Sequence, residues 1–252
     1  MKTALLTGTS SGIGEALARR LASDGWRLLL IARRADRLDA LAGEIGATYE
    51  AADLTKADDV ARVAARAESE FERLDLLVNN AGGNRKRGEF GDPDYGYAYV
   101  REVMAQNFDS AVRVTEALLP LLRRSAPSAI VNVGSIAGRI ARPRVGAYNA
   151  AKFALNGWTE GLHHEEKSHG VHVGLVTPGF IATEGFPQEQ LTGKPWTRWM
   201  VGKPEQGVEA ILKAANGKAE VSVPAWYGLL PRLRYATPGL VRLALSRGAR
   251  RT

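Results

Sequence analysis

Short, strongly apolar runs alternate with longer segments of helical period along the whole of this 252-residue chain. Two of the runs, residues 28–31 and 76–78, are continuously apolar, which is typical of strands buried on both faces. We expect strands at residues 2–7, 27–32, 47–51, 74–79, 128–134, 171–177 and 219–223. We expect helices between them, at residues 13–24, 35–45, 57–72, 97–123, 148–168 and 205–216. This alternation predicts a single-domain α/β fold, with a doubly wound parallel sheet of seven strands and helices on both faces.

The composition narrows the function classes. The chain has no cysteine, so it forms neither a disulfide nor a cysteine-ligated metal site. Its four histidines, at positions 163, 164, 169 and 172, have no carboxylate pair at metal-binding spacing, so we expect no metal. No GxSxG motif of a serine hydrolase occurs. The apolar run near the N-terminus is too short for a signal peptide, and no run approaches the roughly 18 to 20 residues of a membrane span. We therefore expect a cytoplasmic protein.

The net charge of +7 is concentrated at the C-terminal end of the chain. Residues 231–252 contain six arginines and no acidic residue, which leaves 28 basic and 27 acidic residues over positions 1–230. The body of the protein is therefore nearly neutral, and we expect no nucleic-acid partner. The alternative is nucleic-acid binding through this tail, which would weaken steeply with salt.

A glycine-rich turn, residues 8–14 (GTSSGIG), follows the first predicted strand and opens the first helix. Glycines at such a turn let the backbone approach a pyrophosphate, whose charge the helix N-terminus favours. The spacing is GxxxGxG and differs from the GxGxxG dinucleotide fingerprint, so a plain strand–helix turn is the alternative. We favour phosphate binding, and with it a Rossmann-like sheet.

Two arginines, Arg33 and Arg34, follow the second predicted strand. In NAD sites an acidic residue near this position binds the ribose 2′-hydroxyl, whereas NADP sites carry an arginine near the 2′-phosphate. No acidic residue occurs before Asp36, so the sequence favours NADP(H). A solvated helix start is the alternative.

Tyr148 and Lys152 are four residues apart on a predicted helix, and therefore on one face, about 6 Å apart along its axis. A free phenol has a pKa near 10, and a neighbouring ammonium lowers it toward the range useful for proton transfer. Ser135 follows a predicted strand, at the sheet edge where doubly wound folds bind ligands, and its hydroxyl could donate to a substrate carbonyl.

Further motifs occur in a fixed order along the chain. They are Thr7-Gly8-Thr9-Ser10-Ser11-Gly12-Ile13-Gly14, Asp53-Leu54, Asn79-Asn80-Ala81-Gly82, Asn107, Ser135, Tyr148-Asn149-Ala150-Ala151-Lys152 and Pro178-Gly179-Phe180-Ile181-Ala182-Thr183. Together they resemble the short-chain dehydrogenase/reductase family, over residues 1 to about 223.

The resemblance implies the catalytic roles. Tyr148 would be the general acid in reduction and the base in oxidation, while Lys152 would hold the nicotinamide ribose and tune Tyr148. Ser135 would polarise the carbonyl, and Asn107 would anchor a water that links Lys152 to solvent. Homo-oligomers built on the two long helices are usual in the family.

The resemblance also implies the NADP(H) site. Asp53 would contact the adenine and Thr183 the nicotinamide carboxamide, while the amide of Asn79 is expected to bridge backbone groups of neighbouring strands. The complete set of expected cofactor-binding residues is Gly8, Ser10, Ser11, Gly12, Ile13, Gly14, Arg33, Arg34, Asp53, Leu54, Asn80, Ala81, Gly82, Tyr148, Lys152, Pro178, Gly179, Ile181 and Thr183.

Two irregular segments bear on the substrate. Residues 179–203 are expected to form a lid whose aromatic residues, among them Trp196 and Trp199, favour an apolar substrate or, alternatively, pack the lid onto the body. Arg85-Lys86-Arg87 in the loop at residues 83–96 could reach an acidic substrate group or the cofactor phosphates, but we favour a solvated charge cluster.

The sequence thus divides into a catalytic domain at residues 1–223 and a basic extension at residues 224–252. The extension could cap the substrate pocket, pack on another subunit or touch an anionic membrane surface; we favour the first two. The predicted function is NADP(H)-dependent interconversion of a carbonyl and an alcohol on a small to medium apolar substrate, with reduction the expected direction. The alternative is a catalytically silent dinucleotide-binding sensor or scaffold.

Overall fold

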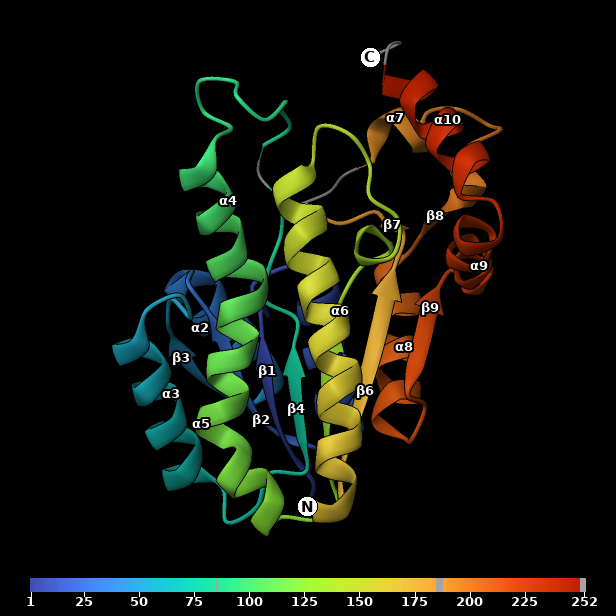
Figure 1. Ribbon diagram of the computed structural model, residues 1–252. Coiled ribbons are helices and arrows are strands. Elements are labelled where there is room, and N and C mark those ends of the chain that lie inside the picture. The colour runs from blue at the N-terminus through green and yellow to red at the C-terminus, as the bar shows by residue number, and fades with distance from the viewer. Residues whose placement is uncertain (85, 185–187, 250–252) are drawn as a thin grey trace.

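The central sheet of the computed structural model has seven parallel strands in the order β3-β2-β1-β4-β5-β6-β9 (Figure 1). The strands are β1 (Thr3–Thr7), β2 (Arg27–Ala32), β3 (Thr48–Ala51), β4 (Leu76–Asn79), β5 (Ser128–Val133), β6 (Val171–Pro178) and β9 (Glu220–Val223). Each predicted strand is present, and the predicted fold class is confirmed. The structure describes residues 1–84, 86–184 and 188–249, without the side chains of residues 190, 244 and 246–249.

Successive residues of the strands face opposite sides of the sheet, and each side has its own helices. In β1, Ala4 and Leu6 belong to one apolar cluster and Leu5 belongs to the other. The first cluster is covered by α1 (Gly12–Ser23), α2 (Ala35–Ile45) and α8 (Pro204–Ala215). The second, toward the viewer in Figure 1, is covered by α3 (Ala57–Glu70), α5 (Ser110–Arg124) and α6 (Gly146–Glu166). Burial on both sides explains why the strand runs are continuously apolar.

The single helix expected at residues 97–123 is divided. It consists of α4 (Tyr97–Met104), a π-helical segment η1 (Ala105–Asp109) and α5. One widened turn inside a helix shifts the face presented by everything beyond it, and such segments are frequent at functional sites.

The segment expected to form a lid contains short elements. β7 (Phe180–Ile181) pairs with β8 (Val201–Gly202) in a separate two-stranded parallel sheet, and α7 (Glu189–Thr192) and the 3₁₀ turn η4 (Arg198–Met200) lie between them.

The C-terminal extension is helical. A 3₁₀ turn η5 (Ala225–Gly228) leads into α9 (Leu229–Ala236) and α10 (Pro238–Ala249), which lie beside the lid at the edge of the molecule next to β9 (Figure 1). Across the described residues, no helix combines the length and the apolar character needed to cross a membrane.

Candidate active site

The glycine-rich turn lies at the carboxyl end of β1, in the middle of the sheet. Strand order reverses here, because β2 lies on one side of β1 and β4 on the other, and such a switch point is where doubly wound sheets bind ligands. Gly8 and Gly12 have φ values of +70° and +63°, which favour glycine. A Cβ on Gly14 would lie 2.2 Å from the carbonyl oxygen of Gly8, so the turn tolerates no side chain there.

Asn80 and Ala81 close the other side of this turn. The Asn80 amide donates to the carbonyls of Thr7 and Gly8, each at 3.1 Å. The hydroxyl of Thr7 accepts from the backbone N–H groups of Asn80 and Ala81 at 2.9 and 3.0 Å. Thr7 was not among the predicted site residues, although its place beside the first glycine was a usable signal.

Asn79 behaves differently from the expectation. Its amide donates to the side chains of Thr115 and Asn132 at 2.9 and 2.8 Å. Within the described structure, this amide makes no hydrogen bond to a strand backbone. The expected backbone bridge is therefore wrong, because the neighbouring strand backbones are already paired in the parallel sheet. Asn79 instead ties the sheet to α5 through a buried side-chain network.

Arg34 lies directly against the glycine-rich turn. Its guanidinium donates to the backbone carbonyl of Ser10 at 3.0 Å and to the Ser10 hydroxyl, and it forms an ion pair with Glu184 at 3.3 Å. Arg37 shares the same carboxylate. Arg33 is exposed on the adjoining position. A guanidinium is thus held at the end of β2, where a 2′-phosphate would be bound.

Asp53 and Leu54 lie beyond the end of β3. The carboxylate of Asp53 accepts from the N–H and hydroxyl of Thr55, and the Asp53 N–H donates to Asp59 at 2.7 Å. Leu54 is buried in the second apolar cluster. These bonds fix the backbone of the loop at the position where the adenine was expected.

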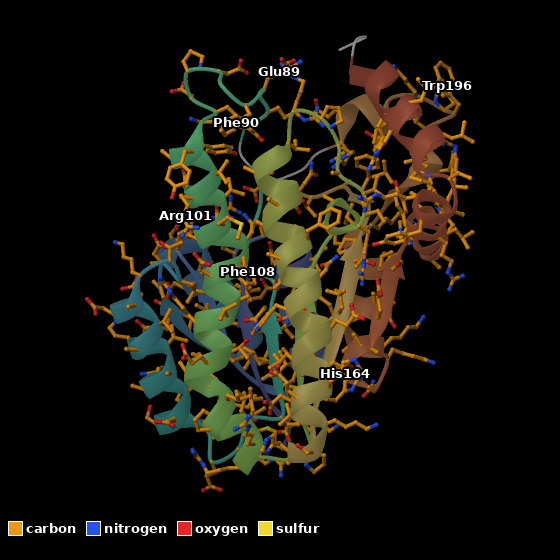
Figure 2. The ribbon with its side chains drawn as sticks, in the orientation of Figure 1. Glu89, Phe90, Arg101, Phe108, His164 and Trp196 are labelled. Carbon is orange, nitrogen blue, oxygen red and sulfur yellow. The ribbon has the colours of Figure 1, made fainter. Side chains whose placement is uncertain are left out.

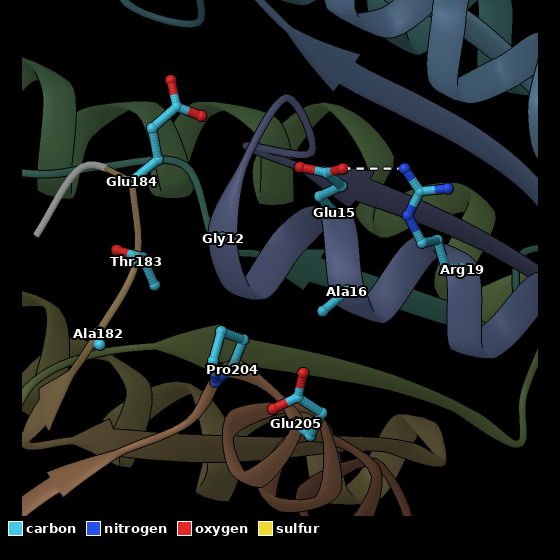
Figure 3. Close-up of a pocket in the computed structure, with 9 residues that line it drawn as sticks. All are labelled: Gly12, Glu15, Ala16, Arg19, Ala182, Thr183, Glu184, Pro204 and Glu205. Carbon is cyan, nitrogen blue, oxygen red and sulfur yellow. Dashed lines mark hydrogen bonds and ion pairs between the residues drawn. The ribbon is translucent and has the colours of Figure 1, made fainter. Parts of the chain in front are cut away.

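A hollow of about 560 Å³ lies on the other flank of the turn, between the start of α1, residues 182–184 and the start of α8 (Figure 3). Its lining includes the carboxylates of Glu15, Glu184 and Glu205 and the guanidinium of Arg19, which is paired with Glu15. The excess of carboxylates disfavours phosphate groups, whereas the Arg34 side of the turn favours them.

Ser135 follows β5 and opens the 3₁₀ turn η2 (Ile136–Gly138). Its hydroxyl accepts from the N–H of Ala137 at 3.1 Å and donates to the carbonyl of Pro178 at 3.4 Å. It is therefore both a cap and a bridge to the end of β6, where residues 178–183 begin.

Lys152 is buried on α6, one turn after Tyr148. Its Nζ donates to the carbonyl of Val133 at 2.9 Å and lies 5.8 Å from the centroid of the Tyr148 ring. Burial lowers the pKa of Lys152 to about 8. The ammonium is therefore close to releasing its proton at neutral pH.

Burial also raises the pKa of Tyr148, and two neighbours oppose that effect. A hydrogen bond with Ser135 and the positive charge of Arg142 lower the pKa. Arg142 therefore acts on the Tyr148 phenol, and the sequence reasoning missed it, because nothing local distinguishes it from a loop arginine.

Asn107 occupies the π-helical segment. Its amide oxygen accepts from the N–H of Gly83 at 2.8 Å, while its Nδ2 donates to the carbonyls of Gly83 and Val103. A Cβ on Gly82, whose φ is +156°, would lie 2.7 Å from the Asn107 oxygen and 3.5 Å from Lys152 Nζ. Gly82, Asn107 and Lys152 thus meet at one point beside Tyr148.

The first residues of the segment expected to form a lid lie against the turn and the end of β6. Thr183 lies against Gly12, whose added Cβ would be 3.1 Å from it, and Ile181 is buried between lid and body. Gly179 lies under the ring of Tyr227, which would contact an added Cβ at 2.7 Å. Trp196 and Trp199 remain exposed, although Trp199 contacts the ring of Trp226.

Three of the four histidines, His163, His164 and His172, pack against one another. The Nδ1 of His163 lies 2.7 Å from the carbonyl of Val173, and its ring packs edge-on against His164 and His172. In the portion of the chain that the structure describes, no group of three or more His, Cys, Asp or Glu side chains could hold a metal ion.

The fold and this site define a dinucleotide-binding α/β protein with a Tyr/Lys pair beside the binding turn. Comparison with known proteins agrees, since residues 2–192 match the family model described as short chain dehydrogenase. The chain belongs to the short-chain dehydrogenase/reductase family, and so to a family of oxidoreductases that bind a nicotinamide dinucleotide.

Individual relatives act on different compounds. The chain is 39% identical over 189 residues to 11-beta-hydroxysteroid dehydrogenase 1A of Arabidopsis thaliana, covering 73% of this chain and 53% of that protein. A short-chain dehydrogenase from Streptomyces avermitilis is similar in structure, with a TM-score of 0.79, 29% identity and 98% of each chain covered. A 3-ketoacyl-(acyl-carrier-protein) reductase from Brucella melitensis, solved with NADH, has a TM-score of 0.79 and 27% identity, covering 88% of this chain and 96% of that one.

Proposed function

We propose that this protein is an NADP(H)-dependent enzyme that interconverts a carbonyl and an alcohol on a small to medium, largely apolar substrate, with reduction the preferred direction. The observation that carries the proposal is the convergence of Ser135, Tyr148 and Lys152 beside the glycine-rich turn. Those side chains come from two elements, η2 with its flanks and α6, which pack against each other at the carboxyl edge of the sheet.

Each of the four site residues has its own role in the proposed reaction. Tyr148, protonated across the neutral range because burial raises its pKa, donates its phenolic proton to the substrate oxygen. The Ser135 hydroxyl donates a hydrogen bond to the same oxygen as negative charge develops there. Lys152 supplies a nearby positive charge and a proton store, and Asn107 fixes the backbone at residue 83, next to Gly82 and Lys152. The bound nicotinamide supplies the hydride.

The preference for NADP(H) is supported by the charge at the end of β2. Arg34 is anchored on Ser10, and Arg33 and Arg37 flank it, so a 2′-phosphate would meet three guanidiniums. Glu184 holds Arg34 in the free protein, and the 2′-phosphate would replace that carboxylate. The Brucella melitensis relative was solved with NADH, which lacks the 2′-phosphate.

We also propose a homo-oligomer built on the outer faces of α5 and α6. Phe108 of η1, directly before α5, and Trp158 of α6 meet edge to face, with ring centroids 6.3 Å apart, and both side chains keep part of their surface exposed. Light scattering of the full chain tests this proposal, and a monomer at micromolar concentration would contradict it.

NADPH oxidation with a graded carbonyl panel tests the catalytic proposal. Tyr148→Phe is expected to lose at least about a hundredfold in turnover while still binding NADPH. The matched control is Tyr97→Phe, because Tyr97 is exposed at the start of α4. Unchanged turnover in Tyr148→Phe would remove Tyr148 as the acid. No turnover by the wild type across the panel, with NADPH still bound, would favour the sensor function.

A further inference from the structure

Arg142 is a partly buried cation without a carboxylate partner, in the loop between η2 and α6. Its Nε atom is buried and has no hydrogen-bond partner within the described structure. None of the ion pairs formed by the described residues includes Arg142, whereas the arginines of α1 and α3 are each paired with a carboxylate. A buried charge of this kind costs free energy unless something compensates it.

The position of Arg142 is fixed relative to the catalytic tyrosine. The Asn149 side chain, buried on α6 next to Tyr148, donates to the Arg142 carbonyl at 2.7 Å. The guanidinium lies 5.0 Å from the centroid of the Phe180 ring, and its positive charge acts on Tyr148 and Tyr227. Arg142 therefore faces the space between the catalytic tyrosine, the first lid strand and the C-terminal turn.

The surroundings of Arg142 add positive charge. Arg87, from the loop at residues 83–96, is close enough for its charge to act on Arg142. Arg142 and Arg144 also line a mostly apolar pocket of about 380 Å³ between the loop at residues 83–96, α4 and the start of α6, and the lining of this pocket does not include Tyr148 or Phe180. The only carboxylate among its described lining residues is Glu89, whose side chain is exposed and not paired with either arginine. Of the Arg85-Lys86-Arg87 cluster, Arg85 lies outside the described residues.

We propose that Arg142 binds an anionic group, of the carboxylate class, at the end of the substrate remote from the carbonyl that Tyr148 protonates. This inference rests on the proposed function and refines its substrate, since an otherwise apolar oxo compound would carry one carboxylate. A carboxylate supplies the missing acceptor for the Nε–H, and guanidinium and carboxylate match as a two-bond fork. The half-buried setting strengthens that pair relative to one in water.

The alternative is that Arg142 only packs on Phe180 as a cation–π contact and tunes Tyr148. The two roles predict different effects on charged and uncharged substrates. Tuning of Tyr148 affects the reduction of every substrate equally, whereas charge pairing affects only those substrates that carry the anion. The informative quantity is therefore the ratio of kcat/KM for an oxo acid to kcat/KM for its methyl ester.

The kinetic test uses a series of straight-chain oxo acids and their methyl esters, with NADPH. The wild type is expected to prefer the acid at the best chain length, and Arg142→Gln should reduce the acid-to-ester ratio at least tenfold. Arg142→Lys should retain part of the preference, because it keeps the charge and loses the fork. The control is Arg101→Gln, which removes the same charge from an exposed site on α4 (Figure 2). An unchanged ratio in Arg142→Gln would overturn the proposal.

A binding experiment tests whether Arg142 binds an anion without relying on turnover. Calorimetric titration of the NADP⁺-loaded protein with benzoate and with benzamide compares an anion and a neutral molecule of equal size. Benzoate is expected to bind at least tenfold more tightly than benzamide, and Arg142→Gln should remove that difference. Equal affinities in the wild type would refute an anion site. If the wild type reduces no carbonyl yet binds benzoate through Arg142, the proposed function fails and the anion site stands.

Discussion

At the scale of single residues, this site depends on charged groups kept where charge is costly. Lys152 is buried with one hydrogen bond, to the carbonyl of Val133, and burial lowers its pKa to about 8. Arg142 is partly buried without a carboxylate, and burial lowers its pKa as well. Such groups destabilise the folded chain and become useful only when a ligand supplies their partners, which is the usual relation between stability and function at a binding site.

Replacing Lys152 with methionine is expected to stabilise the cofactor-free protein while abolishing turnover. Burial lowers the pKa of Lys152 from 10.5 to about 8, so the unfolded chain binds this proton more tightly than the folded protein does. At neutral pH this difference costs the folded state about 3 kcal/mol, and losing the bond to Val133 offsets about 1 kcal/mol of the gain. A rise of about 4–8 °C in Tm is the expected result, measured by calorimetry without cofactor.

The gain in stability should depend on pH in one direction. Below about pH 8 the cost of burying Lys152 is fully present, and between about pH 8 and 10.5 the wild type loses this proton and becomes relatively more stable. The advantage of Lys152→Met should therefore shrink as the pH rises through that window. An advantage that stays constant up to about pH 10 would contradict the assigned cause.

Replacing Arg34 with glutamine is expected to weaken NADPH binding about ten- to a hundredfold and to change NADH binding little, because only NADPH carries the 2′-phosphate. Arg101→Gln is the matched control, since Arg101 is an exposed arginine of α4 that is not part of the proposed 2′-phosphate site. Fluorescence titration with both cofactors gives the two Kd values. Equal losses for NADPH and NADH would show that Arg34 does not bind the 2′-phosphate.

At the scale of elements, the sequence predicts the strands and helices that follow from a local hydrophobic period. It misses the features that depend on contacts with residues far away in the chain. The seven strands lie within a few residues of their predicted places, because burial on both faces leaves a continuous apolar run. The division of the helix at residues 97–123 had no local signal. It coincides with Asn107, whose bonds to Gly83 come from a loop 24 residues away.

Replacing Asn107 with alanine should lower kcat/KM at least tenfold and loosen the backbone near Gly83. The substitution removes the partner of the Gly83 N–H and C=O, so both become unpaired beside Lys152. The control is Gln106→Ala in the same π-helical turn. Because a purely structural loss would not change proton transfer, the pH profile of kcat/KM is measured together with amide hydrogen exchange at residues 82–84. A pH profile and an exchange rate identical to those of the wild type would show that Asn107 does not position the backbone at residues 82–84.

At the scale of the whole molecule, the C-terminal extension joins the lid to the body. Tyr227 is 2% exposed, packs against Phe180 and Gly179, and donates its hydroxyl to the carbonyl of Met200 at 3.2 Å. Arg234 on α9 donates to the carbonyl of Arg139 and lies over the Phe153 ring. The sequence shows that this tail is basic and apolar, but its anchoring side chains contact residues 27 to 95 positions away, and such contacts leave no periodic pattern in the sequence.

The extension should therefore divide into a part that completes the fold and a part that does not. Deleting residues 237–252 is expected to leave Tm and turnover near those of the wild type, whereas deleting residues 224–252 removes Tyr227 and Arg234 and should give an unstable protein. Because the longer deletion could fail to fold, Tyr227→Ala is the quantitative test, with an expected loss of about 3–5 kcal/mol in the free energy of unfolding. Tyr235→Ala, at an exposed position of α9, is the control. Equal stability of the two alanine variants in urea unfolding would show that the lid holds its place without the extension.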